Sequence, residues 1–310
     1  MPFWGPFRRC LSAVALVALV VGMSSCLARR RVITRNGKDV QQKLLVADKQ
    51  VLLDRVVARF SAIQSFAATV DMVPALGSVD KGKITELKDV RAYIYLRKPS
   101  QIRLIGLYPF VRTKAFDMVS TGDDFRLYLP SKNRFIVGPN RVDKPSPNKI
   151  ANLRPFHFLD ALMVRPLDPD RETALLENFT DEDNAAYIVH IVEKRPSGEV
   201  ELKRDVWFER VGLRMVRQKI FDAKGNILTD ARYDQWQTYD GVFFPKHIEI
   251  NRPQDEYAVV ITIVKMDINK TLPADRFTLE QPAGTELQVL GAKPESSFGS
   301  SATGSYAQGR

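Results

Sequence analysis

The sequence of 310 residues is poor in the side chains that carry most metal and redox chemistry, with only three histidines and two cysteines. The histidines, His157, His190 and His247, do not have the spacing of a metal-binding motif. The chain also lacks a Gly-x-Ser-x-Gly nucleophile elbow. These absences predict a protein that is not an enzyme, with no catalytic residues, no metal and no cofactor.

The remaining charge pattern does not indicate catalysis or nucleic-acid binding. The acidic pairs, Asp123-Asp124 and residues 181–183, fall in expected turns, where solvated loop charge is the ordinary interpretation. The formal net charge is +10, but no nucleic-acid recognition motif accompanies it. An acidic membrane surface is therefore the better-suited partner.

The first 26 residues have the order of an export signal. Arg8 and Arg9 precede an apolar run over 11–21, and small residues follow immediately before Cys26. The run is shorter than the roughly 20 apolar residues that a spanning helix needs. We expect residues 1–25 to be removed as a signal peptide. The other cysteine lies in that segment, so the mature protein would have one thiol and no internal disulfide.

The tetrapeptide Met23-Ser24-Ser25-Cys26 resembles the bacterial lipobox, although the family prefers Leu at the position of Met23. The resemblance implies that Cys26 receives a diacylglycerol and becomes the lipidated first residue. Because Leu27 follows rather than Asp, it also implies sorting to the periplasmic face of the outer membrane, with the inner membrane as the alternative. An ordinary signal peptide that is cut elsewhere is the competing interpretation of the segment.

Residues 26–40 are expected to form a basic tether between the membrane and the folded domain. Arginines at 29–31, with Arg35 and Lys38, occur there without apolar periodicity. Each such charge near an anionic bilayer contributes about 1 kcal/mol of attraction. The folded domain is then expected over 41–290, and the Ser- and Gly-rich residues 291–310 are expected to be a disordered tail.

Within that domain, apolar residues at helical spacing predict one amphipathic helix between Val40 and Phe66. The rest is typical of β-strands separated by hairpin turns. A proline-bounded segment, 145–166, interrupts them and is expected to be a loop with a short helical lid at 158–163. The expected strands are 92–96, 101–107, 116–120, 125–129, 135–138, 187–193, 200–209, 213–222, 227–239, 242–251 and 257–269. We therefore predict a mainly β (α+β) fold, in which about ten or eleven antiparallel strands form one curled sheet.

Several stretches resemble the Lol-type (LolA/LolB-like) lipoprotein carrier and receptor fold. They are residues 51–66, similar to its entry helix, 96–104 and 122–130, similar to two hairpins, and 264–269, similar to its closing strand. The resemblance covers about 45–290 and implies a half-open antiparallel barrel whose apolar hollow holds acyl chains. In that family the carrier is soluble and the receptor is lipidated, so Cys26 places this chain nearer the receptor.

A curled sheet of this size encloses space that an apolar ligand can occupy. Strand alternation selects inward candidates, each of which could equally be plain core. The cavity-lining candidates are Ile94, Leu104, Phe125, Leu127, Phe135, Val206, Phe208, Met215, Phe244 and Ile261.

One predicted turn has large apolar residues where polar ones are expected. It contains Leu107, Tyr108 and Phe110. In the Lol receptor the corresponding loop carries an exposed apolar residue that works at the membrane, so the resemblance implies that these residues insert into the membrane. The alternative is a turn that folds back onto the core.

The sequence thus predicts a membrane-anchored protein that binds acyl chains of lipids or lipoproteins, in lipid transport or outer-membrane biogenesis. A periplasmic carrier or another envelope protein is a possible partner. The competing hypothesis is a structural or regulatory envelope lipoprotein whose β domain binds a protein.

Overall fold

The computed structural model describes residues 43–78, 83–86, 88–140, 152–181 and 184–290. The expected signal peptide, Cys26, the tether up to residue 40 and the tail from residue 291 lie outside the described residues. In the described part, no helix combines the length and the apolar character needed to cross a bilayer.

The described chain consists of one large sheet with two α-helices and two short 3-10 helices. The helices are α2 (Lys49–Ala62), α3 (Pro155–Leu162), η3 (Pro130–Lys132) and η5 (Ala274–Phe277). The first seven strands are β1 (Ser65–Ser78), β2 (Lys83–Glu86), β3 (Val90–Arg97), β4 (Gln101–Leu107), β5 (Lys114–Ser120), β6 (Asp124–Leu129) and β7 (Arg134–Pro139). The others are β8 (Glu172–Thr180), β9 (Ala185–Lys194), β10 (Val200–Glu209), β11 (Met215–Phe221), β12 (Ile227–Tyr239), β13 (Val242–Arg252), β14 (Tyr257–Ile268) and β15 (Glu286–Val289).

The sheet consists of two meanders that share one seam. The order is β15-β7-β6-β5-β4-β3-β1-β14-β13-β12-β11-β10-β9-β8, with β2 paired to β1. The seam pairs β1 with β14, from Phe66 opposite Ile268 to Leu76 opposite Tyr257. Every pairing is antiparallel except that of β15 with β7. The predicted mainly β fold, with its curled antiparallel sheet, N-terminal helix and short helical lid, is confirmed.

The sheet has 15 strands rather than the expected ten or eleven, because four were missed. β1 includes Ala67, Ala68, Pro74 and Gly77, which have weak β propensity. β8 is an edge strand whose sequence, ETALLENFT, has little alternation. β2 and β15 are only four residues long.

The N-terminal helix is shorter than the predicted span. α2 begins at Lys49, and the described residues 43–48 before it are not helical. Asp48 occupies the N-cap position in extended conformation, and Ile63 ends the helix. The lid helix α3 begins at Pro155, three residues before the expected 158–163 segment. Proline suits this first position because it has no backbone N–H to leave unpaired.

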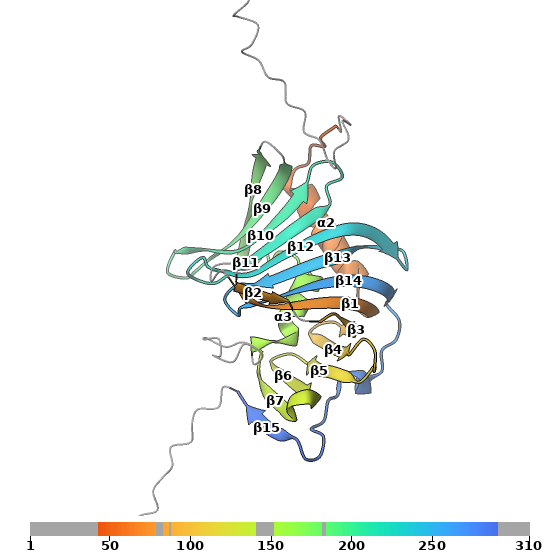
Figure 1. Cartoon of the computed structure of the whole chain (residues 1–310). Coiled ribbons are helices and arrows are strands. Elements are labelled where there is room, and N and C mark those ends of the chain that lie inside the picture. Colours follow the sequence, from red (N-terminus) through yellow and green to blue (C-terminus); the bar gives the residue numbers. More distant parts are fainter. Residues whose placement is uncertain (1–42, 79–82, 87, 141–151, 182–183, 291–310) are drawn as a thin grey trace, which may run out of the picture.

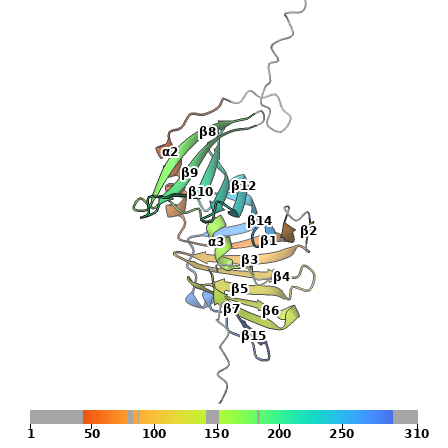
Figure 2. The same ribbon diagram turned by 90° about the vertical axis from the view of Figure 1, so that its left-hand side faces the viewer.

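The sheet bends so that its β8–β12 part stands across its β1–β7 part, with α3 in the angle between them (Figure 1, Figure 2). α3 lies there because the chain must cross the concave face to connect β7, near one edge of the sheet, with β8 at the other. Leu52 and Val56 of α2, with Phe158 and Leu162 of α3, join the main buried cluster on that face.

The outer face of the β3–β7 meander is covered by the C-terminal strap, residues 272–290. Phe277 and Leu279 of the strap form a second buried cluster with Val119 and Phe135. Three arginines on the sheet also hold the backbone of the strap. Arg97 donates to the Leu272 carbonyl, Arg103 to those of Arg276 and Thr278, and Arg126 to that of Leu279, at 2.9–3.0 Å.

Candidate functional site

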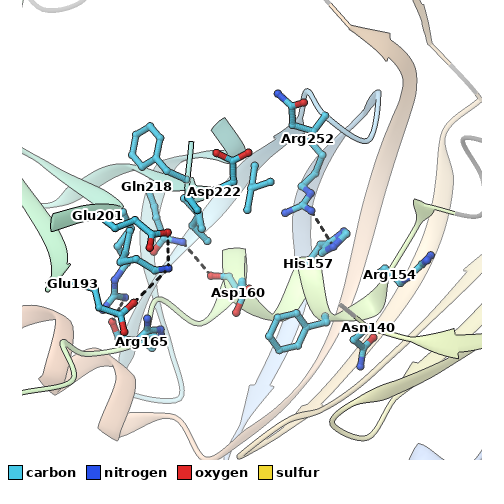
Figure 3. Close-up of a pocket in the computed structure, with 18 of the residues that line it drawn as sticks. Asn140, Arg154, His157, Asp160, Arg165, Glu193, Glu201, Gln218, Asp222 and Arg252 are labelled. Atoms are coloured by element: carbon cyan, nitrogen blue, oxygen red, sulfur yellow. Dashed lines mark hydrogen bonds and ion pairs between the residues drawn. The ribbon is translucent and has the colours of Figure 1, made fainter. Parts of the chain in front are cut away.

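A pocket of about 940 Å³ lies beside α3 on the concave side of the sheet. Its walls come from strands β8–β12, the end of β13 and the turn that follows it, α3, and the segments on either side of α3. Figure 3 shows side chains from these elements facing one another across it. Seven basic and seven acidic side chains line the pocket, so its chemistry is polar rather than apolar.

Arg204 and Glu172 form a buried ion pair in one wall, with 4% of each side chain exposed. Nη2 of Arg204 lies 3.2 Å from Oε2 of Glu172, and the same guanidinium donates to the backbone carbonyls of Arg165 and Pro166. Burial lowers the pKa of Arg204 to about 10, which leaves it charged at neutral pH. Burial alone would raise the pKa of Glu172, but the backbone N–H of Asp168 and the two arginines lower it.

His157 of α3 is hydrogen-bonded to one side chain from each strand of the β13–β14 hairpin, Arg252 of β13 and Tyr257 of β14. Nη2 of Arg252 lies 2.9 Å from Nε2 of His157. Because a guanidinium can only donate hydrogen bonds, Nε2 must be the acceptor. Nδ1 must then carry the proton and donate to the Tyr257 hydroxyl at 2.8 Å. Burial, followed by the charges of Arg252 and Arg154, holds the pKa of His157 well below 6.5. The ring is therefore neutral and fixes α3 to the sheet.

Three residues of the pocket each have a buried polar atom without a hydrogen-bond partner among the described residues. These atoms are Nε of Arg204, Oε1 of Gln218 and Oδ1 of Asn140. The other ends of the same side chains are bonded. Nε2 of Gln218, for example, donates to the Asp160 carbonyl of α3 at 3.2 Å, as Figure 3 shows. Buried polar groups are normally satisfied, so these atoms require an explanation.

Ten residues were predicted to line an apolar cavity, and none of them lines this pocket. Nine belong to the main buried cluster. The tenth, Phe135, belongs to the second cluster under the C-terminal strap, whereas its neighbour Ile136 is in the main cluster. In β7 the inward and outward positions are therefore the reverse of those predicted. On the other strands, the nine candidates chosen by the alternation of apolar and polar residues belong to the main cluster.

The β4–β5 turn is exposed and does not fold back onto the core. Phe110 is 95% exposed and Val111 is 69% exposed, while Tyr108 is exposed to a lesser degree. Leu107 is half-buried because it still belongs to the end of β4. Arg112 and Lys114 follow directly and are also exposed.

The polar pocket was not anticipated from the sequence. Its signal was present in β10 and β11, where Arg204 and Gln218 occupy the same inward face as the apolar Val206. A charged residue on an inward position of an otherwise apolar strand requires a buried partner. The partner, Glu172, is on a strand that the alternation did not reveal. Among the described residues, no group of three or more His, Cys, Asp or Glu side chains is placed to hold a metal ion.

Comparison with known proteins identifies the family. A family model described only as an uncharacterized protein family matches residues 110–281, more than half of the chain. The chain belongs to this family. The matched segment includes the strands and the lid helix that form the pocket. No curated protein sequence matches the chain.

Several solved structures are similar to the chain at low sequence identity. A LolA superfamily protein from Nitrosomonas europaea is 15% identical, with a TM-score of 0.47 over 76% of this chain and 99% of that one. A DUF1329 family protein from Desulfovibrio piger is 16% identical, with a TM-score of 0.47 over 74% and 96%. A domain assigned to outer-membrane lipoprotein sorting, from Vibrio parahaemolyticus, is 15% identical, with a TM-score of 0.48 over 73% and 94%.

Proposed function

We propose that this protein is a lipid-anchored envelope protein that binds the acyl chains of lipids or lipoproteins at a membrane surface. Cys26 would carry the anchor, and the periplasmic face of the outer membrane is the proposed location. The observation that carries the proposal is the β4–β5 turn, which holds Phe110 and Val111 in solvent. The protein would act by binding and transfer, without covalent chemistry.

The composition of the turn suits an interfacial contact. Exposed apolar side chains that gather at one place, rather than singly, mark interaction sites. Here Phe110 and Val111 are followed by the exposed Arg112, which would face anionic headgroups while the apolar pair enters the acyl region. Lys114 is instead paired with the buried carboxylate of Asp117 at 2.7 Å. Full burial of one such apolar side chain contributes about 1.5–3 kcal/mol.

The proposed acyl-chain site is the apolar interior between α3 and the β3–β7 meander. Leu104 and Leu127 of the sheet and Phe158 of α3 are fully buried there. An acyl chain could replace the contacts that α3 makes with the sheet if the helix moved away. The predicted cavity residues on this face would then become its lining.

Vesicle flotation tests the membrane contact. The full chain with Cys26→Ser, so that acylation does not mask the effect, is floated with phosphatidylglycerol vesicles. We expect Phe110→Asp to reduce binding at least about tenfold, since more than 1.4 kcal/mol of apolar transfer is lost. The control is Val289→Asp, a change at an exposed apolar residue of β15 that should bind as the parent does. Equal flotation of Phe110→Asp and the parent would contradict the proposal.

Native mass spectrometry with lipid extraction tests the interior. We expect a stoichiometric acyl ligand on the parent protein and its loss in Leu127→Trp, which fills the space under α3. Thermal melting checks that the variant folds, because overpacking costs about 1–3 kcal/mol. A parent protein that carries no ligand and takes up no fluorescent fatty acid would contradict acyl-chain binding.

A protein-binding role is the second candidate, and the edge strand β8 favours it. Among the strands that the structure describes, β8 pairs only with β9, so its other edge can accept an added strand. Leu175 is 59% exposed there. Under this alternative, Leu175→Pro should abolish capture of the partner and leave vesicle flotation unchanged.

A further inference from the structure

We infer that α3 is a lid held shut by a proton-sensitive latch, which releases the helix when His157 takes up a proton. The latch is the hydrogen-bond chain Arg252–His157–Tyr257, which joins α3 to strands β13 and β14. Its release would open the proposed acyl-chain site between α3 and the β3–β7 meander, so its role in binding rests on the proposed function. The latch itself is a contact within the chain and can be tested without a ligand.

The latch requires a neutral His157 ring. In that form Nε2 accepts from Nη2 of Arg252 at 2.9 Å, and Nδ1–H donates to the Tyr257 hydroxyl at 2.8 Å. A protonated imidazole donates from both nitrogens. Its Nε2–H would then point at a guanidinium, which has no lone pair to accept it. Two positively charged donors would therefore face each other where the neutral ring makes a hydrogen bond.

The groups that face the ring do not compensate a positive charge on it. Burial of His157 lowers its pKa most, and the charges of the buried Arg252 and of Arg154 at the N-cap of α3 lower it further. Oδ2 of Asp255 lies 3.8 Å from Nδ1 of His157. This carboxylate already accepts from Nε and Nη2 of Arg252, at 2.8 and 2.7 Å. Burial raises the pKa of Tyr257, so its hydroxyl stays uncharged.

The pocket beside α3 provides a solvated position for the protonated ring. His157 and Arg252 both line it, and Figure 3 shows the hydrogen bond between them in its wall. With a volume of about 940 Å³ the pocket has room for many water molecules, which would solvate a charged imidazole. Rotation of the side chain into the pocket, away from Arg252, breaks both hydrogen bonds of the latch. The first turn of α3 then loses these contacts with β13 and β14.

Two further hydrogen bonds hold the second half of α3 to the sheet, and neither titrates near neutral pH. The Asp160 carbonyl accepts from Nε2 of Gln218 at 3.2 Å, and the Ala161 carbonyl accepts from the Tyr233 hydroxyl at 2.7 Å. Burial raises the pKa of Tyr233. Gln218 is 1% exposed, and its Oε1 has no partner among the described residues. An unsatisfied buried acceptor raises the free energy of the closed form, and opening of α3 would admit water to it.

Hydrogen–deuterium exchange between pH 7 and 5 tests the latch on the full chain with Cys26→Ser. Exchange in a peptide that covers α3, corrected for the intrinsic effect of pH, reports opening of the lid. With one proton taken up per opening and an ordinary pKa of about 6.5 for the open ring, exchange should rise toward a limit of about 25-fold. A peptide that covers α2, which packs on the same face and contains no histidine, should not respond.

Two variants and one control assign the response to the latch. His157→Gln replaces the titrating ring by an amide that still donates and accepts, so exchange in α3 should no longer depend on pH. The control is His247→Gln, which removes a histidine of β13 outside the latch and should keep the response of the parent. Tyr257→Phe decides the outcome should His157→Gln not fold. It removes the acceptor of Nδ1–H but keeps the ring, so α3 should exchange faster at pH 7 and still respond to acid.

The inference is overturned if exchange in α3 of the parent does not depend on pH, or if His157→Gln responds as the parent does. It is overturned equally if α2 and the strands respond as strongly as α3, since that would indicate global unfolding. Uptake of a fluorescent fatty acid at both pH values separates the two proposals. A responsive α3 without uptake would support the latch and overturn acyl-chain binding, whereas uptake with an unresponsive α3 would do the reverse.

Discussion

The two meanders share one concave face but use it differently. In β3–β7 the inward residues are apolar, for example Ile94, Leu104 and Phe125, and they pack beneath α3. In β9–β12 the inward face changes along a single strand, from Val206 to the charged Arg204. One half therefore has an apolar, filled interior, and the other forms a polar pocket. The two meanders of one sheet thus differ in the chemistry of the face that they share.

The largest expected effect is on the polar half. Glu172→Ala would leave the guanidinium of Arg204 buried without its carboxylate, and breaking a buried pair in this way costs about 3–5 kcal/mol. Urea denaturation measures the loss. As a matched control, Glu286→Ala removes a long, exposed ion pair with Arg134 and should change stability by less than about 1 kcal/mol. Similar small losses of stability for both variants would mean that the buried ion pair between Arg204 and Glu172 does not stabilise the pocket wall.

A comparable effect is expected in the apolar half, for a different reason. Leu104→Ala removes a fully buried side chain and should cost about 2–5 kcal/mol through lost burial and the cavity that remains. The same denaturation experiment measures it, with Val289→Ala as the exposed control. If the loss of stability in Leu104→Ala does not depend on salt concentration whereas that in Glu172→Ala does, the two halves are stabilised by different interactions. A loss below about 1 kcal/mol would indicate that this half is already hollow.

His157 makes the polar half sensitive to acid. Its pKa in the folded state lies well below 6.5, so the unfolded chain binds the proton first as the pH falls. Its contribution to stability is therefore complete above about pH 6.5 and is lost below it, with a slope of up to about 1.4 kcal/mol per pH unit. Melting temperatures of the parent and of His157→Gln between pH 7 and 5 test this prediction. Parallel curves would refute it.

The smallest effect is expected at His190 on the outer face, and it has the opposite sign. Burial alone would lower the pKa of His190, but hydrogen bonds to Glu177 and Asp205 outweigh it and raise the pKa. The contribution of this ion pair is complete below about pH 6.5 and is lost as the pH rises through the raised pKa. Because the group is partly exposed, we expect less than about 1 kcal/mol. His190→Gln should thus cost more at pH 6 than at pH 9 in the same melting series, and an equal cost would contradict the assignment.

Most of the fold could be predicted because its signals are local. Alternation and hairpin turns located β3–β7 and β9–β14, and the apolar spacing located α2. The strand β8 escaped prediction because an edge strand is half-exposed and its sequence does not alternate. The apolar character of the β4–β5 turn was also evident, since large side chains in a turn depart from the usual composition.

The sequence by itself determined the strand alternation, the turns and the inward apolar face, because each depends on residues a few positions apart. Only the tertiary structure decided the polar pocket. Arg204, Glu172 and Gln218 come from three strands, and the pairing order alone brings them together. α3 closes the site because the chain must cross the concave face between the two ends of the sheet. Such contacts join residues far apart in the chain, so no local pattern records them.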